Sequence, residues 1–196
     1  INISGGSTLT ITSGGILNLN NGNNISTPLE FGTAEAIIHA QGSLTLSGVI
    51  SGTGGMSKHG AGVATFSAPN TYSGTTLITG GTTVFVGSIP SGAPSAFGSG
   101  TSAIVLAPAG VGTGGTTARL VHAAGGSVAF DRGQLVSGRD ARYAAPIRGI
   151  AQFLGNNASS FLVINGDISG SGPVTDGSAT AGTIRLNGNN TFPYGA

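Results

Sequence analysis

Lys58 and His59 stand side by side in the glycine-rich stretch Lys58-His59-Gly60-Ala61-Gly62 and could in principle do chemistry together. A lysine whose pKa is lowered by burial can act as a nucleophile or a base, and a neighbouring histidine can relay protons. In a strand, however, adjacent side chains point to opposite faces, and no acidic residue lies nearby in the sequence to orient the imidazole. The sequence therefore favours a structural role for this pair over a catalytic one.

The acidic residues offer one candidate pair for glycan hydrolysis, which needs two carboxyl groups facing each other across a groove. Glu30 and Glu35 are close in the sequence and have no arginine beside them. They leave a glycan-cleaving or glycan-binding β-helix open as an alternative. The main expectation is a chain with no catalysis of its own.

A charge-rich segment follows residue 130 in a chain that is otherwise nearly free of charges. It holds two aspartates among four arginines, and this mixture of signs favours ion pairs between neighbouring parts of the fold. The second interpretation is a recognition patch for an anionic glycan or a partner protein. The candidate partner-facing residues are Arg132, Arg139, Asp140, Arg142 and Arg148.

No motif predicts a cofactor or a metal site. The glycine spacings lack the strand, helix and Gly-Lys-Ser/Thr context of phosphate-binding loops. The glycine-aspartate nonapeptide of calcium-binding β-helices does not occur, and the chain has no cysteine. An ice-binding threonine ladder needs the same spacing on every coil. Thr8 and Thr10 fit that spacing, but adjacent pairs such as Thr75-Thr76 face opposite ways, so this function receives little weight.

The composition indicates an ordered chain that is not an ordinary helical globule. Only 7% of the 196 residues are charged and 37 are glycine, yet 38% are hydrophobic and occur in alternating runs. The net charge of +1 is too small to predict a surface for nucleic acid or anionic membranes. No stretch resembles a signal peptide or a membrane span.

Short strands divided by glycine turns are expected along the whole chain. The alternation predicts inward side chains at Leu9 and Ile11, at Leu17 and Leu19, and at Leu44 and Leu46. Residues 33–40 could form one short helix.

A right-handed parallel β-helix explains this texture better than a sandwich or a barrel, because tryptophan is absent and the expected core residues are modest aliphatics. Residues 1–196 are expected to form a single solenoid segment, with a non-repeat, charge-rich region at about 119–150. Coils of roughly twenty-odd residues would give about nine coils and a rod of about 40 Å. Its open ends would expose strand edges, so more solenoid is expected on either side.

A longer repeat is also visible. The segment Leu46 to Met56 recurs as Ile164 to Val174, with Ile50-Ser51-Gly52 matching Ile168-Ser169-Gly170. A second match, Asn70-Thr71-Tyr72 with Asn190-Thr191-Phe192, follows in the same order. Two ordered matches predict a long repeating unit.

Residues Gly54 to Gly81 resemble the autotransporter-associated β-strand repeat, and Ser95 to Leu106 resembles the turn and strand that follow it. The resemblance covers residues 46–106 well, residues 161–196 weakly and residues 119–150 not at all. In the second copy, Pro173 to Asp176 replaces the lysine corner. The matching motif residues are Met56, Lys58, Gly60, Gly62, Phe66, Asn70, Thr71, Tyr72 and Gly74.

This resemblance implies a scaffold and a location more than an activity. Passenger domains of that family are right-handed parallel β-helices displayed on or released from Gram-negative cells. For Lys58 it implies a structural task, covering the rim of a coil or bonding carbonyl groups at a turn. The main expectation is an adhesin-like stalk whose partner is a host-cell or matrix protein or glycan, without nucleic acid or membrane contact. The alternative is a filament segment that assembles end to end through open β edges.

Overall fold

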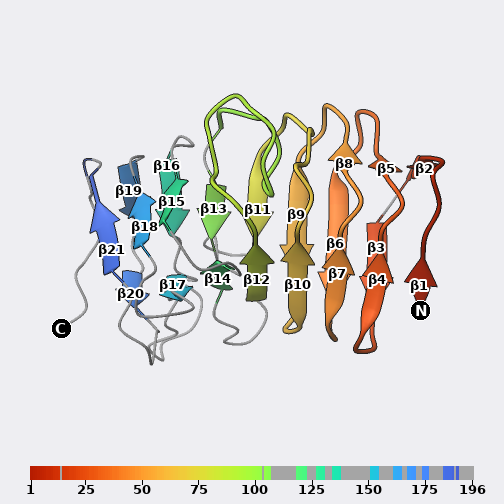
Figure 1. Ribbon diagram of the computed structural model, residues 1–196, viewed down its shortest axis with the longest axis horizontal. Helices are drawn as coiled ribbons and strands as arrows, with labels where there is room; N and C mark the ends of the chain where they lie inside the picture. The colour runs from red at the N-terminus through yellow and green to blue at the C-terminus, as the bar shows by residue number, and fades with distance from the viewer. Residues whose placement is uncertain are drawn as a thin grey trace.

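The computed structural model describes residues 1–13, 15–102, 104–106, 118–122, 127–130, 134–137, 151–154, 161–164, 167–170, 174–176, 183–187 and 189. These residues form strands, turns and bends. Among them there is no helix long and apolar enough to cross a membrane. Figure 1 shows the strands stacked side by side from the N-terminal to the C-terminal end of a rod.

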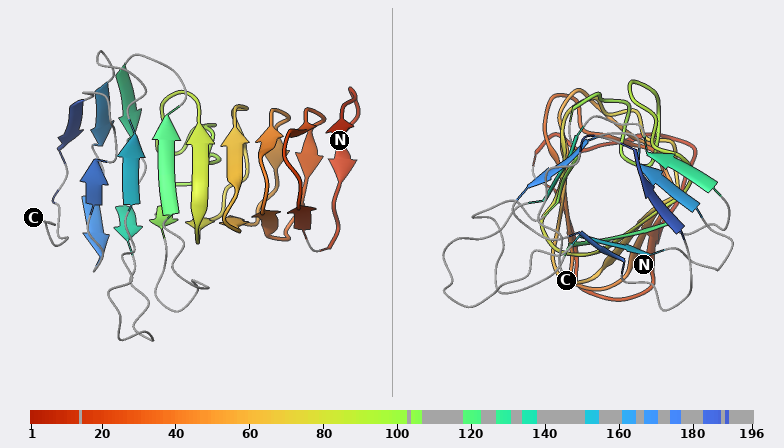
Figure 2. Two further views of the ribbon diagram at one scale, coloured as in Figure 1. Left: turned by 90° about the horizontal axis from the view of Figure 1, so that it is seen from below. Right: turned by 90° about the vertical axis from the view of Figure 1, so that its left-hand side faces the viewer.

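Three sides of the rod are built from parallel sheets, and each turn of the chain adds strands to them (Figure 2). The eight-stranded sheet has the order β1 (Asn2–Ile3), β4 (Asn23–Ile25), β7 (Leu44–Leu46), β10 (Val63–Phe66), β12 (Gly81–Phe85), β14 (Ala118–His122), β17 (Ala151–Leu154) and β20 (Val174–Asp176). The seven-stranded sheet has the order β19 (Asp167–Gly170), β16 (Gln134–Ser137), β13 (Ile104–Leu106), β11 (Thr76–Ile78), β9 (Met56–His59), β6 (Ala36–Ala40) and β3 (Gly15–Asn18).

Two shorter sheets complete the third side. One consists of β2 (Leu9–Thr10), β5 (Leu29–Glu30) and β8 (Ile50–Ser51), and the other of β15 (Ser127–Phe130), β18 (Phe161–Ile164) and β21 (Thr183–Leu186). A typical early coil is β4, β5 and β6, which β7, β8 and β9 then repeat. The prediction of an all-β parallel solenoid is therefore confirmed.

The coil length explains the difference from the predicted count of about nine. Early coils have a regular length, since the register partners Leu44 and Ala64 are as far apart in the sequence as Ile37 and Ser57 are. Later coils are longer, because Val84 pairs with Val121 and Leu77 with Val105. The longest sheet accordingly has eight strands in the described part of the chain.

The core consists of side chains that stack on their counterparts in the next coil. Ile25, Leu46, Phe66 and Phe85 form one such column, and all four are buried. Leu44 and Leu46 point inward as predicted. Because every coil repeats the same inward positions, small changes of side-chain size along a column keep the core filled.

Two local predictions are wrong. Leu17 and Leu19 are 66% and 63% exposed, while Asn18 is buried. Ile16 pairs with the buried Ile38 and Leu17 pairs with His39, so Ile16 points toward the core and Leu17 away from it. The neighbouring coil thus decides which half of an alternating strand points inward.

Residues 33–40 do not form a helix, because Ala36–Ala40 is strand β6 and pairs with strands on both sides. Ala36, Ile38 and Ala40 are buried, and Ile37 is exposed. Hydrogen bonds to two neighbouring coils outweigh the weak local preference of these residues for a helix.

The long repeat is not the structural repeat. Ile50 lies in β8 of a three-stranded sheet, whereas Ile168 lies in β19 of the seven-stranded sheet. The two matching segments therefore occupy different sides of the rod. The residues of the second match, at 190–192, lie outside the described residues. The unit that repeats in space is one coil.

Candidate functional site

The Lys58 side chain lies inside the solenoid. Lys58 occupies a core column between Ile38 and Ile78, and all three residues are fully buried. Its Nζ atom donates hydrogen bonds to the carbonyl oxygens of Gly60 at 2.9 Å, Gly62 at 2.8 Å and Gly80 at 2.7 Å. The three ammonium hydrogens thus have one acceptor each. We call this arrangement the Lys58 site.

The Lys58 site joins two consecutive coils. Gly60 and Gly62 follow β9 in the same coil as the lysine, whereas Gly80 precedes β12 in the next coil. The next residue, Gly81, has a φ of +68°, and a Cβ atom there would lie 2.5 Å from the Lys58 Nζ atom. Glycine is therefore required at position 81 both by the backbone conformation and by the space that the ammonium group fills.

Burial lowers the pKa of Lys58 from 10.5 to about 8. The cause is desolvation, because an apolar environment disfavours the charged form. At neutral pH the side chain is still mostly protonated, and the carbonyl dipoles take the place of water around the charge. A fully buried ammonium group whose three hydrogens are bonded to the backbone fits a structural role better than nucleophilic chemistry.

His59 points to the outside of the same strand, as strand geometry predicts. Its ring stacks on that of His39 in the preceding coil, with centroids 6.5 Å apart and planes 10° from parallel. Its Nδ1 atom lies 3.0 Å from the Thr79 hydroxyl oxygen in the following coil. Burial and the neighbouring His39 lower the pKa of His59. Lys58 and His59 therefore do not converge on a common reaction centre.

A second buried polar group lies at the corner after β10. The Asn70 side chain accepts a hydrogen bond from the Ile50 backbone N–H at 2.8 Å and donates one to the Ala96 carbonyl at 2.7 Å. The Asn70 and Ser95 backbones form an antiparallel bridge. One side-chain amide thus bonds to the coil before it and to the loop after it. We call this arrangement the Asn70 site.

Tyr72 fixes the same corner from inside the core. Its hydroxyl lies 2.8 Å from the Thr76 hydroxyl, which donates to the Phe97 carbonyl at 3.2 Å. The Tyr72 carbonyl accepts a hydrogen bond from the Ser99 backbone N–H. Gly98, with a φ of +76°, lies so close to Tyr72 that a Cβ atom there would be 2.3 Å from the Tyr72 carbonyl oxygen. The segment around Ser95 to Ser99 is therefore fitted to the Asn70-Thr71-Tyr72 corner.

The remaining motif positions also belong to the framework. Met56 and Phe66 are buried in the core. Thr71 has an exposed side chain, and its backbone N–H donates to the Ile50 carbonyl. Gly74 donates from its backbone N–H to the Gly54 carbonyl at 3.1 Å. The structure thus places all nine predicted motif residues in one continuous region, from β9 to the turn before β11.

The predicted partner-facing residues Arg132, Arg139, Asp140, Arg142 and Arg148 lie outside the described residues. Of the two acids considered for hydrolysis, Glu30 is half-buried and accepts hydrogen bonds from the Gly32 backbone N–H and from the Ser51 hydroxyl. Glu35 is exposed. Within the described ranges, no group of three or more His, Cys, Asp or Glu side chains could hold a metal ion.

Two partners of the motif were not predicted from the sequence, the buried Thr76 and Ser95. Ser95 donates from its hydroxyl to the Gly98 carbonyl and accepts a hydrogen bond from the Phe97 backbone N–H. These two partners could have been predicted from polar residues at the inward positions of an otherwise apolar pattern. A buried hydroxyl must find a partner, so such positions indicate a cross-coil bond.

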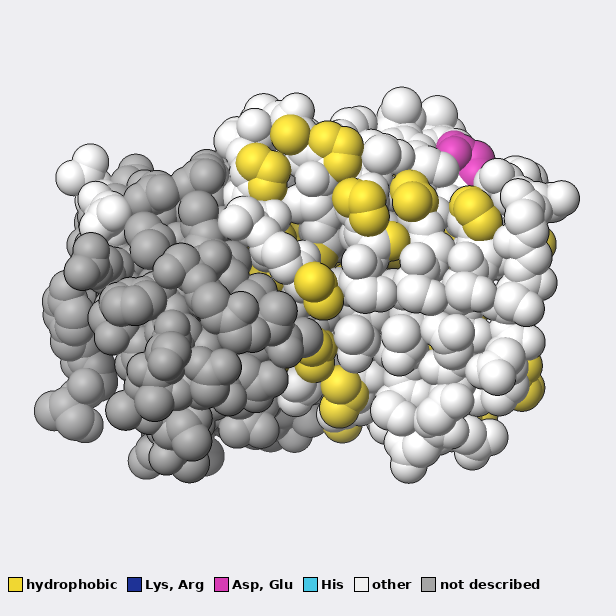
Figure 3. Space-filling model, viewed as in Figure 1, with side chains coloured by type: hydrophobic (Ala, Val, Ile, Leu, Met, Phe, Trp, Pro, Cys, Tyr) yellow, Lys and Arg dark blue, Asp and Glu magenta, His cyan; other side chains and the backbone are white. Residues whose placement is uncertain are grey.

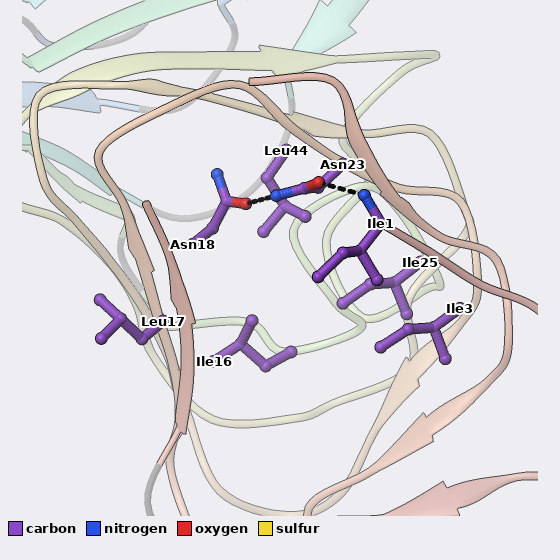
Figure 4. A pocket seen from close by; sticks show the side chains of 8 residues that line it. All are labelled: Ile1, Ile3, Ile16, Leu17, Asn18, Asn23, Ile25 and Leu44. Carbon is purple, nitrogen blue, oxygen red and sulfur yellow. Dashed lines mark hydrogen bonds between the residues drawn. The ribbon is translucent and has the colours of Figure 1, made fainter. Parts of the chain in front are cut away.

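An apolar hollow marks the N-terminal end of the core (Figure 4). Asn18 and Asn23 lie at its edge, where Asn23 bonds to both the Asn18 side chain and the amino group of Ile1. The hollow is open because β1, β2 and β3 are the end strands of their sheets. Its apolar lining consists of Ile1, Ile3, Ile16, Leu17, Ile25 and Leu44.

No family model matches the chain, and the searches of curated proteins and of solved structures also find no match. The resemblance to the autotransporter-associated repeat therefore stays a prediction that is carried by the residues 46–106 themselves.

Proposed function

We propose that this chain is a structural spacer, a stiff segment of the stalk of a secreted or surface-displayed adhesin-like protein, without catalysis of its own. The observation that carries the proposal is the pair of buried sites, Lys58 and Asn70, which join consecutive coils from inside the core. The motif residues that could have formed a reactive cluster are used to hold coils together.

The backbone hydrogen bonds between coils support the same function. The hydrogen bonds of a parallel solenoid run along the axis of the rod, so an axial load is shared by the three sides of every coil. The inner hydrogen bonds of Lys58, Asn70 and Thr76 add cross-links that water does not reach easily. A low surface charge allows such a rod to space other domains without binding nucleic acid or anionic lipid.

Surface display can be tested on intact cells that produce the full-length protein. An antibody against residues 1–102 should label the cells before permeabilisation, and external protease should remove the label only after prolonged digestion. Labelling that appears only after permeabilisation would overturn the proposal.

A second candidate function is a filament that grows end to end through open β edges, as parallel sheets that run along the rod allow. Within the described chain, the outer edges of β1, β2 and β3 face no other strand. A second copy could add its last strands to these edges in the same parallel sense, which would give an open, head-to-tail assembly.

Sedimentation velocity separates this candidate from the stalk. A filament-forming chain should give species that grow with protein concentration, and Ile16→Lys at the open end should abolish them. Ile37→Lys, on the side of the rod, is the matched control and should leave assembly unchanged. A purified chain that stays monomeric at every concentration excludes the filament and leaves the stalk unaffected.

A further inference from the structure

Two of the three histidines of the chain lie side by side on the outer face of the seven-stranded sheet. His39 in β6 and His59 in β9 are register partners in neighbouring coils, and both side chains are half-buried. Their rings are nearly parallel, with centroids 6.5 Å apart. In the part of the chain that the structure describes, no third His, Cys, Asp or Glu side chain completes a metal site with them. We call these two side chains the histidine pair.

Hydrogen bonds leave the Nε2 atom of His59 as the place where a proton binds. The Thr79 hydroxyl donates to the Lys58 carbonyl at 3.2 Å, so its oxygen accepts the hydrogen of His59 Nδ1 across 3.0 Å. In the neutral ring, Nε2 then carries the lone pair, and no described residue bonds to it. A proton that binds there makes the ring a cation and leaves the bond to Thr79 in place.

Gln41 bonds to the neutral form of His39. The Gln41 Nε2 atom lies 3.0 Å from the His39 Nε2 atom, and because an amide nitrogen only donates, the ring nitrogen accepts. Protonation of that ring nitrogen ends this hydrogen bond. The hydrogen bonds around the histidine pair are therefore complete when both rings are neutral.

The surroundings supply little negative charge to balance two imidazolium ions. The neighbouring strands β3 and β11 contain no charged residue. Lys58, next to His59 in β9, adds a positive charge, and the exposed Glu35 is the one described acid that acts on His59. The rod as a whole is poor in charge. Among the described residues on the face in Figure 3, no lysine, arginine or histidine is visible and acidic atoms form one small spot.

The pKa of His59 reflects this balance. Burial lowers the pKa from its ordinary value of 6.5, His39 lowers it further, Glu35 acts in the opposite direction, and Lys58 adds to the lowering. The unfolded chain therefore takes up this proton at a higher pH than the folded chain does. The contribution of His59 to the free energy of unfolding is complete above pH 6.5 and is lost as the pH falls from 6.5 through the lower folded value.

We propose that the histidine pair makes the contact between β6 and β9 an acid-sensitive joint of the rod. At mildly acidic pH both rings take up protons, and strand register holds their like charges in neighbouring coils. Two unit charges at the observed separation of 6.5 Å should weaken folding by roughly threefold or more relative to the neutral pair. The third histidine, His122, belongs to β14 in the other large sheet, so the loosening should be local to this joint.

A double-mutant cycle with His39→Gln, His59→Gln and the combined variant tests the repulsion. Urea denaturation of the full chain is measured at pH 7.5 and at pH 5 in low salt. Glutamine can still donate to Thr79 and stays neutral at both pH values. Going from pH 7.5 to pH 5, each single variant should gain roughly threefold or more in folding relative to the unmodified chain, and the second substitution should add less. High salt should reduce this gain. A coupling between the two substitutions that is equal at both pH values overturns the proposal.

NMR titration of the imidazole rings measures the same interaction without unfolding. His39→Gln should move the titration midpoint of His59 to higher pH, because a neighbouring positive charge is removed. Glu35→Gln is the matched variant of opposite sign and should move the midpoint to lower pH. His122 is the internal control and should titrate alike in all three proteins. A His59 midpoint that does not rise in His39→Gln shows that the two rings do not repel each other, and the proposal is then wrong.

Amide hydrogen exchange locates the loosening. After correction for the intrinsic effect of pH, β6 and β9 should exchange faster at pH 5 than at pH 7.5, and β7 and β10 in the other large sheet should change less. The combined histidine variant should lose this difference between the two sheets. Equal acceleration in all four strands, or a difference that persists in the combined variant, would show that the histidine pair is not the joint.

Discussion

Lys58 brings a positive charge into the core and neutralises it with backbone carbonyl groups alone. Burial lowers the pKa of Lys58 because the charged form loses its hydration inside the core. The lysine nevertheless satisfies oxygens from two coils with one side chain. The residue therefore acts as a cross-link, and its removal should affect stability more than surface properties.

Lys58→Met should lower the free energy of unfolding by about 2 kcal/mol at pH 7. Methionine fills the channel of the lysine stem but leaves three carbonyl oxygens without a donor. The loss is limited because Gly60 and Gly62 are only partly buried and can regain water, and because the variant no longer buries a charge. Urea denaturation measures the change, and Thr53→Ala at an exposed position is the control.

The same pair of proteins should differ in pH dependence. The folded pKa of Lys58 is about 8 and the unfolded value is 10.5, so between these pH values the unfolded chain binds more protons. The contribution of Lys58 to the free energy of unfolding should therefore rise from pH 8 to pH 10.5. Subtracting the Lys58→Met curve removes the titration of tyrosines. A difference that falls over this range would contradict the assignment of desolvation as the larger effect.

Gly81→Ala and Gly87→Ala separate backbone strain from the loss of the Lys58 site. Both glycines have positive φ, +68° and +78°, but a Cβ atom at Gly87 would meet nothing within 4 Å. Gly87→Ala should cost about 1 kcal/mol and Gly81→Ala about 3 kcal/mol or more, because a Cβ atom at 81 would lie 2.5 Å from the Lys58 Nζ atom and 2.5 and 2.6 Å from the carbonyl oxygens of Gly60 and Gly62.

Thermal denaturation of the two glycine variants gives the comparison. In the background of Lys58→Met, the cost of Gly81→Ala should shrink but stay above that of Gly87→Ala, since the contact with Nζ is then gone while those with the Gly60 and Gly62 carbonyl oxygens remain. Equal costs at the two glycines would show that the ammonium group does not fill the space beside Gly81.

At the scale of elements, the corner after β10 is held by one amide that contacts two other parts of the chain. The Asn70 position needs an acceptor for the Ile50 N–H and a donor for the Ala96 carbonyl, and the amide supplies them with two separate atoms. An ionised aspartate has no donor, which explains why asparagine rather than aspartate suits this corner of the motif.

Asn70→Asp should destabilise the protein by about 3 kcal/mol at neutral pH, because a buried carboxylate would face the Ala96 carbonyl. The loss should become smaller near pH 4, where a protonated carboxyl can again donate to that oxygen. Chemical denaturation at both pH values checks this, with Asn20→Asp at an exposed position as the control. A loss that is the same at both pH values would show that the Ala96 bond is not what matters.

The strands were predictable where the inward residues of one coil are unambiguous, as at Leu44 and Leu46. They were not predictable at Leu17 and Leu19, where both halves of the alternation carry apolar residues and only the register with β6 decides between them. The same is true of residues 33–40, whose strand exists because neighbouring coils supply hydrogen bonds on both sides. Information of this kind is held by the neighbouring coil and is absent from a local window of sequence.

The Lys58 site was predictable in kind but not in detail. The resemblance to the autotransporter-associated repeat implies that Lys58 covers the rim of a coil or bonds carbonyl groups at a turn, and the buried side chain does the second. The third acceptor, Gly80, comes from the following coil and is 22 residues away, so it could be identified only once the register was known.

Over the whole molecule, the early coils of the rod are equivalent units. Coils from β4 to β11 follow one another at separations of 20 to 22 residues, as shown by the cross-coil hydrogen bonds Ile50 to Asn70, Ser51 to Glu30 and Lys58 to Gly80. A solenoid of this kind is stabilised by each coil and its contacts with the two neighbours. Removing one complete coil should therefore leave the rest of the rod intact.

The most direct measurement of this claim compares two deletions in the full chain. Removal of residues 37–56 joins Ala36 to Ser57, which follows Met56, the register partner of Ala36, and keeps the Lys58 site. Removal of residues 37–46 deletes half a coil and shifts every inward side chain that follows. By circular dichroism and urea denaturation, the first variant should retain β structure and cooperative unfolding, and the second should not. If both variants folded equally well, or if the whole-coil deletion failed to fold, the coils would not be equivalent units.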